Sequence, residues 1–268
     1  MLSLSERSVR AAGFSETLTN IKLCNGESPP SPDSQIIGCT RLIETDHETK
    51  SLLTIAYNNR GNALTAKGDF DGAIKDYNAA VGINPTYAKA FNNRGLAFRK
   101  KGDHARALQD FDQAIRLDPK YARALANRAA TLEKTYDYQR ALQDYRAAAD
   151  LQPDLSEAWS GLCWTRAITG ELREALDDCN KALVTRPDDP TALDSRALVQ
   201  LKMGAFDRAI EDYNTALRLQ PVLAGSLYGR GVGKLKAGDL AGGEADIAAA
   251  KNIDPAVDAE FSRYGVGQ

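Results

Sequence analysis

The sequence predicts an all-α fold, a solenoid of stacked helix-turn-helix units, and three observations predict it. A pattern of residues returns every 34 positions, six times in succession, over residues 54–255. Apolar residues inside a unit recur at spacings of three and four, which is the period of a helix and not of a strand. Each unit closes on a proline, and these prolines are also 34 residues apart: Pro85, Pro119, Pro153, Pro187, Pro221 and Pro255. A fixed period of this length indicates a solenoid, whose units bury their apolar faces only by stacking.

Each unit is expected to contain two helices. In the first unit they cover residues 54–67 and 71–83. Gly68 ends the first helix, because glycine takes a positive φ at little cost. Asp69 offers a carboxylate that caps the second helix. Pro85 cannot continue the second helix, but it fits the first turn of the next one.

The two ends of the chain are expected to differ from the repeats. Residues 1–34 are predicted to form a loop-rich N-terminal extension, and residues 35–53 a degenerate half repeat that caps the N-terminal end. Six repeats follow over residues 54–255, and residues 256–268 are predicted to form a C-terminal capping helix. Such end units are needed because an uncapped solenoid exposes the apolar face of its last unit.

Bulky, small and aromatic residues return at fixed places in each unit. The first unit has them at Tyr57, Gly61, Leu64, Ala73, Tyr77 and Pro85. This pattern resembles the tetratricopeptide repeat family. The resemblance implies a right-handed superhelix whose first helices line a concave face. One departure is systematic, since arginine stands where the family usually has leucine: Arg60, Arg94, Arg128, Arg196 and Arg230. Only Leu162 keeps the family's choice.

An aspartate follows each of these places by 16 residues, on the second helix of the same unit: Asp76, Asp110, Asp144, Asp178, Asp212 and Asp246. Arginine and aspartate can make a charge-assisted, bidentate bond across the two helices. A catalytic role is the alternative, but an active site is normally built once and not once per repeat. We therefore expect structural pairs. Asp178 needs another partner or water, because Leu162 occupies the arginine place of its unit.

Residues one place before the arginines are expected to face the concave groove. In the first three units they are asparagines: Asn59, Asn93 and Asn127. This repetition resembles the asparagine ladder with which some tetratricopeptide repeats hold extended peptides, since a carboxamide both donates and accepts hydrogen bonds. The alternative is that the asparagines only join neighbouring first helices. We favour the ligand ladder and include the neighbouring amides in the predicted peptide-binding site: Asn58, Asn62 and Asn92.

Some members of the family grip a terminal carboxylate of a chaperone with Lys, Asn, Asn, Lys and Arg over three repeats. The matching places here are Asn58, Asn62, Asn93, Arg123 and Asn127. Two of the cations are thus replaced by asparagine, which weakens the grip on a carboxylate, so chaperone-tail binding is not predicted. The first half of the groove is still cationic through Lys89, Arg99, Lys100, Arg123 and Lys134. A solvated charged face is the alternative interpretation of these cations.

From Glu157 onward, the same face becomes apolar. Its residues are Trp164, Ile168, Leu198, Leu201, Val232 and Leu235, which are called the apolar strip below. An exposed strip of this kind often marks a partner site, and Trp164 is included in the predicted binding site. Two alternatives remain, in which the C-terminal helix or a second copy of the chain covers the strip.

The four cysteines form two similarly spaced pairs, Cys24 with Cys39 and Cys163 with Cys179. The second pair falls on the two helices of one unit, where a Cα separation of ~5–6 Å is in disulfide range. Disulfides and free thiols are equal alternatives. Disulfides indicate a periplasmic or secreted protein, whereas the sequence as written has no signal peptide and indicates the cytoplasm. A metal site is not expected, because no short CxxC spacing occurs.

Composition and motifs argue against several functional classes. The net charge is −2, so no basic field predicts nucleic-acid binding. No apolar run approaches the ~20 residues that span a bilayer, and phosphate loops and nucleophile elbows are absent. The sequence therefore predicts a non-enzymatic scaffold without a cofactor, which binds an extended peptide or a partner helix in its groove. The alternatives are a self-assembling homo-oligomer, or the peptide-recruiting arm of an enzyme encoded elsewhere.

Overall fold

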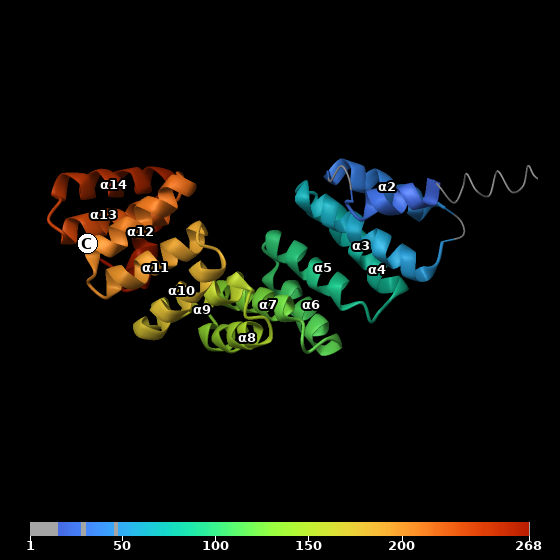
Figure 1. Cartoon of the computed structure of the whole chain (residues 1–268), viewed down its shortest axis with the longest axis horizontal. Helices are drawn as coiled ribbons and strands as arrows, with labels where there is room; N and C mark the ends of the chain where they lie inside the picture. Colours follow the sequence, from blue (N-terminus) through green and yellow to red (C-terminus); the bar gives the residue numbers. More distant parts are fainter. Residues whose placement is uncertain (1–15, 28–30, 46–47, 268) are drawn as a thin grey trace, which may run out of the picture. The chain divides into compact units, whose positions relative to one another are not determined.

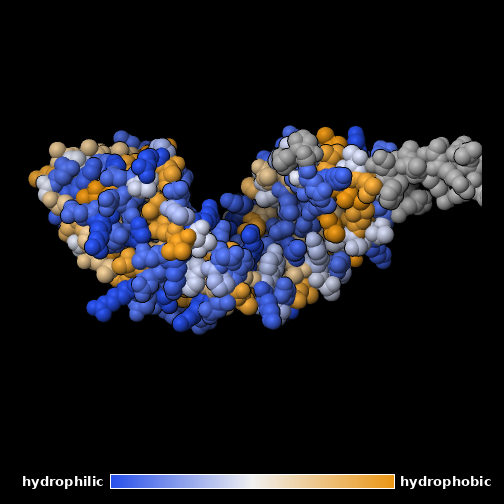
Figure 2. All heavy atoms as spheres, viewed as in Figure 1, coloured by the Kyte–Doolittle hydropathy of each residue, from blue (hydrophilic) through white to orange (hydrophobic). Residues whose placement is uncertain are grey.

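The computed structural model describes residues 16–27, 31–45 and 48–267, which form helices joined by short turns, with no strand among them (Figure 1). The chain divides into two compact units, which are described separately: unit 1 ends at Thr131 and unit 2 begins at Leu132. The surface in Figure 2 is mostly hydrophilic with small hydrophobic patches, because the apolar side chains lie between helices. The all-α repeat fold predicted from the sequence is confirmed.

The helices follow one another in pairs. In unit 1, helical residues 16–24 precede α2 (Pro32–Glu44), α3 (Lys50–Ala66), α4 (Phe70–Ile83), α5 (Ala88–Lys100) and α6 (His104–Leu117). Helix α7 (Ala122–Lys134) contains the boundary between the units. Unit 2 continues with α8 (Tyr138–Leu151), α9 (Ser156–Thr169), α10 (Leu172–Thr185), α11 (Pro190–Lys202), α12 (Phe206–Leu219), α13 (Ala224–Lys236), α14 (Leu240–Ile253) and α15 (Val257–Arg263). The odd-numbered helices α3 to α13 are the first helices of the repeats, and α4 to α14 are the second helices.

Turn residues explain where the helices end. Gly68 and Gly102 follow first helices with φ of 81° and 80°, a region that glycine enters without a steric penalty. Asp69 and Asp103 then accept a hydrogen bond from a backbone N–H in the first turn of the next helix. Tyr136 takes the glycine place of its repeat with φ 61°, and among the described residues no other non-glycine residue has a positive φ. Such a conformation costs a side-chain-bearing residue about 1–2 kcal/mol.

Small residues let the two helices of a repeat approach closely. A methyl group on Gly61 would lie 2.6 Å from Cε1 of Tyr77, and one on Gly95 would lie 2.8 Å from Cε1 of Phe111. Both rings are buried, as are the alanines that the repeat places beside them. The glycines are therefore required by packing, because any larger side chain would push the aromatic ring out of the core.

The N-terminal end differs from the predicted loop-rich extension. Residues 16–24 are helical and pack beside α2, while residues 1–15 lie outside the described part of the chain. Cys24 and Cys39 lie in one buried cluster with Leu42 and Ala56. The helix forms because Ile21 and Cys24, which are three residues apart, both meet this cluster. Helix α2 begins at Pro32 after a capping box formed by Ser31.

The C-terminal segment covers the apolar strip. Leu198, Leu201 and Val232 are buried in one cluster with Val257 and Phe261, and α15 packs against α13 and α14. The ring of Phe261 lies 4.7 Å from that of Tyr228 in α13, measured between centroids. Of the two alternative covers for the strip, the C-terminal helix is thus the one found in unit 2.

Candidate functional site

The arginine column is a structural device. Arg60, Arg94, Arg196 and Arg230 each make two hydrogen bonds of 2.6–2.8 Å to the aspartate 16 residues further on. The bonds join the first helix to the second helix of the same repeat, and the four carboxylates are buried. Hydrogen bonding to Asp76 and Asp212 raises the pKa of Arg60 and Arg196, which remain charged. These pairs confirm the predicted structural role of the two columns.

A third bond from the same arginines was not evident from the sequence. The Nη1 atom of Arg94 donates to Asn78, that of Arg196 to Asn180, and that of Arg230 to Asn214. Each acceptor lies 16 residues earlier, on the second helix of the preceding repeat. One guanidinium therefore links three helices and joins neighbouring repeats. The recurrence of asparagine at this place was the available sequence signal.

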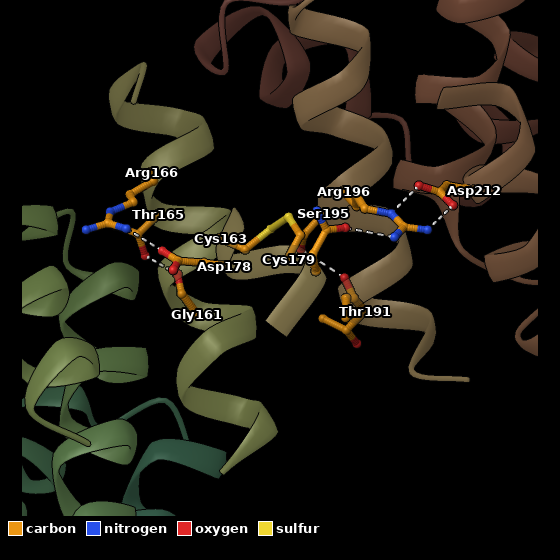
Figure 3. Close-up of a disulfide and its surroundings, with 12 residues drawn as sticks. Gly161, Cys163, Thr165, Arg166, Asp178, Cys179, Thr191, Ser195, Arg196 and Asp212 are labelled. Atoms are coloured by element: carbon orange, nitrogen blue, oxygen red, sulfur yellow. Dashed lines mark hydrogen bonds and ion pairs between the residues drawn. A yellow bond between two sulfur atoms is a disulfide. The ribbon is translucent and has the colours of Figure 1, made fainter. Parts of the chain in front are cut away.

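Asp178 obtains its partner from a different place on the first helix. Nη1 of Arg166 lies 2.5 Å from Oδ2 of Asp178 (Figure 3). Nζ of Lys181 lies 3.4 Å from Oδ1 of the same carboxylate. Arg166 comes one helical turn after Leu162 on α9. Its guanidinium therefore pairs with Asp178 in place of the arginine that the other repeats have at the position of Leu162. Burial raises the pKa of Asp178, and the attraction of Arg166 and Lys181 offsets this effect only in part.

Both cysteine pairs are bonded. Cys24 and Cys39 have a Cα separation of 4.6 Å, and Cys163 and Cys179 one of 5.0 Å. Figure 3 shows the second bond between α9 and α10, beside the Arg166 pair. All four sulfur-bearing side chains are buried. Of the two alternatives left by the sequence, the structure contains disulfides.

The predicted asparagines of unit 1 bond to one another. Nδ2 of Asn93 donates to Asn58 at 3.0 Å and to Asn62 at 2.9 Å, and Nδ2 of Asn127 donates to Asn92 at 2.9 Å. Nδ2 of Asn59 donates to Asn25 at 3.2 Å. The bond from Asn59 reaches Asn25, which precedes α2. The other three bonds join neighbouring first helices. Three of these amides are half-buried, namely Asn59, Asn93 and Asn127. Asn58 and Asn92 are buried and Asn62 is exposed.

Four of the five predicted cations are exposed, and Arg99 is the exception. Lys89 and Lys100 lie on α5 and Arg123 on α7, and none of the three makes an ion pair with another residue in the described part of the chain. Arg99 is half-buried and donates to the backbone oxygen of Asn127. Lys134 belongs to unit 2, where it contributes to a pocket.

Unit 2 contains a pocket of about 890 Å³ on its first helices. Tyr136, Tyr138, Trp164 and Tyr264 form a row of edge-to-face rings along it, with centroids 5.9–6.2 Å apart. Gly161, Ile168 and Pro190 also line the pocket. The polar and charged lining residues are Glu133, Lys134, Glu157, Ser160, Arg186, Asp189, Thr191, Ser195, Glu260 and Arg263. Of the sequence-predicted site residues, Lys134 and Trp164 meet here. The other three aromatic rings were not predicted from the sequence. The one available signal was Tyr136, which stands where the other repeats have glycine.

One polar group in this pocket lacks a partner. The side chain of Ser160 is 9% exposed, and its hydroxyl makes no hydrogen bond with any described residue. A buried hydroxyl without a partner costs free energy that a hydrogen-bonding ligand would recover. No group of three or more His, Cys, Asp or Glu residues in the described ranges could hold a metal ion.

Comparison with known proteins agrees with the geometry. Family models of the tetratricopeptide repeat match residues 61–102, 88–121, 111–143, 134–190 and 195–258. The chain belongs to the tetratricopeptide repeat family. This is a class of protein-interaction scaffolds that are in general non-enzymatic. No curated protein matches the sequence, and no described helix is long and apolar enough to cross a membrane.

Several solved structures share the fold. PilF of Pseudomonas aeruginosa is 19% identical with a TM-score of 0.68, and the match covers 81% of this chain and 99% of that chain. A tetratricopeptide repeat protein from Parabacteroides merdae is 18% identical with a TM-score of 0.66, over 94% of this chain and 99% of the other. YrrB, described as having an unusual peptide-binding site, is 22% identical with a TM-score of 0.53, over 70% and 95% of the two chains. At these identities the likeness shows the fold alone.

Proposed function

We propose that the chain is a protein-interaction scaffold that holds an extended peptide against the first helices of unit 1. The observation that carries this proposal is the equivalence of places between repeats. Glu157 and Thr191 line the pocket of unit 2, and the same place in unit 1 is occupied by Ile55, Lys89 and Arg123. In unit 1, two of the three residues at this place are thus exposed cations.

The asparagines fall on another pocket-facing place. Gly161 and Ser195 line the pocket of unit 2, and Asn59, Asn93 and Asn127 stand at the equivalent place in unit 1. An amide offers two N–H groups and two lone pairs. Asn127 uses one of these four in its bond to Asn92, Asn59 uses two, and Asn93 uses three. The remaining capacity suits the alternating N–H and C=O groups of an extended peptide.

The exposed cations select the kind of peptide. Lys89, Lys100 and Arg123 carry three positive charges on α5 and α7, without acidic partners among the described residues. Charged groups at a binding surface set specificity more than affinity. We therefore expect a peptide with acidic side chains spaced along an extended backbone. YrrB offers a precedent for peptide binding in a protein of this fold.

Charge reversal tests the proposal without disturbing the fold. The chain is screened against an array of random decapeptides, together with the double variant Lys89→Glu and Arg123→Glu. Wild type should select acidic peptides, and the variant should select basic ones. The matched control reverses Lys75 and Arg116, which are exposed cations on the second helices α4 and α6, and it should keep the wild-type preference.

Two outcomes would refute this function. One is a wild-type chain that selects no charge pattern, and the other is a control variant that changes the preference as strongly as the test variant. The asparagines themselves are less suitable targets. Their replacement by alanine removes bonds between first helices, so a loss of stability would accompany any loss of binding.

The two disulfides also support a cellular setting. Buried disulfides persist in oxidising compartments and are rare in a reducing cytosol. Cys24–Cys39 and Cys163–Cys179 therefore favour a periplasmic or secreted scaffold.

A further inference from the structure

We infer that the first-helix face of unit 2 is a binding site for an amphipathic helix of a partner protein, and that α15 occupies part of this site in cis. The inference extends the proposed scaffold function to unit 2 and rests on that function. The face consists of the apolar strip on α9, α11 and α13, together with the adjoining pocket.

The anchors of α15 have the spacing of a helix bound in a groove. Val257 and Phe261 are buried, and Tyr264 is half-buried with its ring 5.9 Å from that of Trp164. The three side chains stand at positions n, n+4 and n+7 of the segment. This is the pattern with which amphipathic helices insert one face into an apolar groove.

Polar contacts fix the direction of α15 on the face. Asp258 accepts a hydrogen bond of 2.5 Å from the Tyr228 hydroxyl and pairs with Lys251 at 3.0 Å. These bonds hold the pKa of Asp258 below its usual value. At the other end, Nη1 of Arg263 donates to the Tyr136 hydroxyl at 3.1 Å. The face thus recognises an acidic residue directly after the first anchor and a donor near the last one.

The cis helix leaves the site partly empty. Helix α15 has seven residues and is about 10 Å long. Beside its last turn lies the pocket of about 890 Å³, of which Glu260, Arg263 and Tyr264 form one wall. The buried Ser160 hydroxyl in this pocket has no partner among the described residues. A longer partner helix in the place of α15 would bring further side chains to this pocket, whose lining includes Ser160.

The same geometry argues for a partner helix and against a second copy. A segment tethered to its own site has an effective concentration of roughly millimolar. The α15 of a second copy makes the same contacts without this advantage, so it cannot displace the first. A longer helix gains the pocket contacts in addition. The expected partner segment carries an apolar residue, an acidic residue directly after it, and aromatic residues at n+4 and n+7. It continues beyond n+7 with a side chain that hydrogen-bonds Ser160.

Synthetic peptides test this assignment on the full chain. The short probe has the sequence of residues 254–267, and the extended probe replaces 265–267 by two further helical turns that include glutamine. Their affinities are measured by fluorescence anisotropy for wild type and for Phe261→Ala, which weakens α15. The short probe should bind Phe261→Ala at least tenfold more tightly than wild type. A probe with alanine at the place of Phe261 should lose at least tenfold.

Further variants separate docking from folding. If Phe261→Ala does not fold, the double variant Asp258→Asn and Arg263→Ala removes only polar contacts and should raise the affinity of the short probe in the same direction. Ser262→Ala, on the exposed side of α15, is the matched control and should equal wild type. Thr191→Trp fills the pocket from an exposed place. It should lower the affinity of the extended probe to that of the short one.

The inference is overturned if folded variants bind the probes no better than wild type, because α15 would then be only a structural cap. It is also overturned if Phe261→Ala chains pair through exchange of their C-terminal segments, as measured by light scattering. Neither outcome bears on the peptide preference of unit 1, which is measured with different variants and different peptides.

Discussion

Removal of one arginine from the column gives the sharpest test of how the repeats are held together. Arg94→Ala deletes two bonds to Asp110 and one to Asn78. It leaves the Asp110 carboxylate, whose side chain is 8% exposed, without its cation. Truncating one partner of a buried ion pair costs about 3–5 kcal/mol. Because the Arg94 side chain is 18% exposed, solvent screens part of its interaction with Asp110. We expect a loss near the lower limit, about 3 kcal/mol.

The last repeat offers a matched control. Arg230→Ala removes the equivalent bonds to Asp246, but Nζ of Lys234 remains 2.9 Å from the same carboxylate. Burial favours a raised pKa for Asp246, and the bonds from Arg230 and Lys234 outweigh it and lower the pKa. With Lys234 still in place, the loss should be about 1–2 kcal/mol. Urea unfolding followed by circular dichroism, with hydrogen exchange to locate the change, measures both variants. Equal losses in the two variants would refute the reasoning, as would a loss below about 0.5 kcal/mol for Arg94→Ala.

Three further predictions concern unit 2. Burial raises the pKa of Asp194 to about 6, so the folded state binds this proton more tightly than the unfolded state and stability falls as pH rises from about 4 to about 6. Asp194→Asn should reduce this fall in urea unfolding series, and Asp207→Asn should retain it in full. Cys163→Ala should lower the free energy of unfolding by about 3 kcal/mol under oxidising conditions. Thiol counting on denatured protein from its native compartment should find no free thiol, whereas four free thiols would refute both disulfides. Tyr136→Gly should relieve about 1 kcal/mol of backbone strain, yet it should raise the affinity of unit 2 for the short probe, because Arg263 loses its acceptor.

The repeat made most of the fold predictable. Period, closing prolines and helix spacing predict the helix pairs, because each repeat must solve the same packing problem with the same residue types. Gly68 and Asp69 mark their turn correctly, since positive φ and capping are local requirements. The helical residues 16–24 were missed, because they lack the repeat and their helix depends on packing against α2. Local composition carries little information about such contacts.

The candidate site was only partly predictable. The sequence places Asn93, Lys89 and Trp164 on first helices, as the structure does, since a place on a helix determines the direction of its side chain. It does not reveal that the amides bond to one another, or that Arg166 replaces the missing arginine, because both depend on distances between repeats. The position of α15 was equally hidden. Its anchors fit either an end cap or a groove, and only the folded structure distinguishes the two.

Photo-crosslinking from one first-helix position tests the central claim most directly. Ala66 is exposed on α3 and takes the place that Lys134 and Ile168 occupy in the pocket of unit 2. A photoreactive amino acid at this position should crosslink an acidic peptide selected by the wild-type chain, whereas the same group at Lys75, exposed on the second helix α4, should not. Equal crosslinking at both positions, or crosslinking only from Lys75, would contradict peptide binding by the first helices.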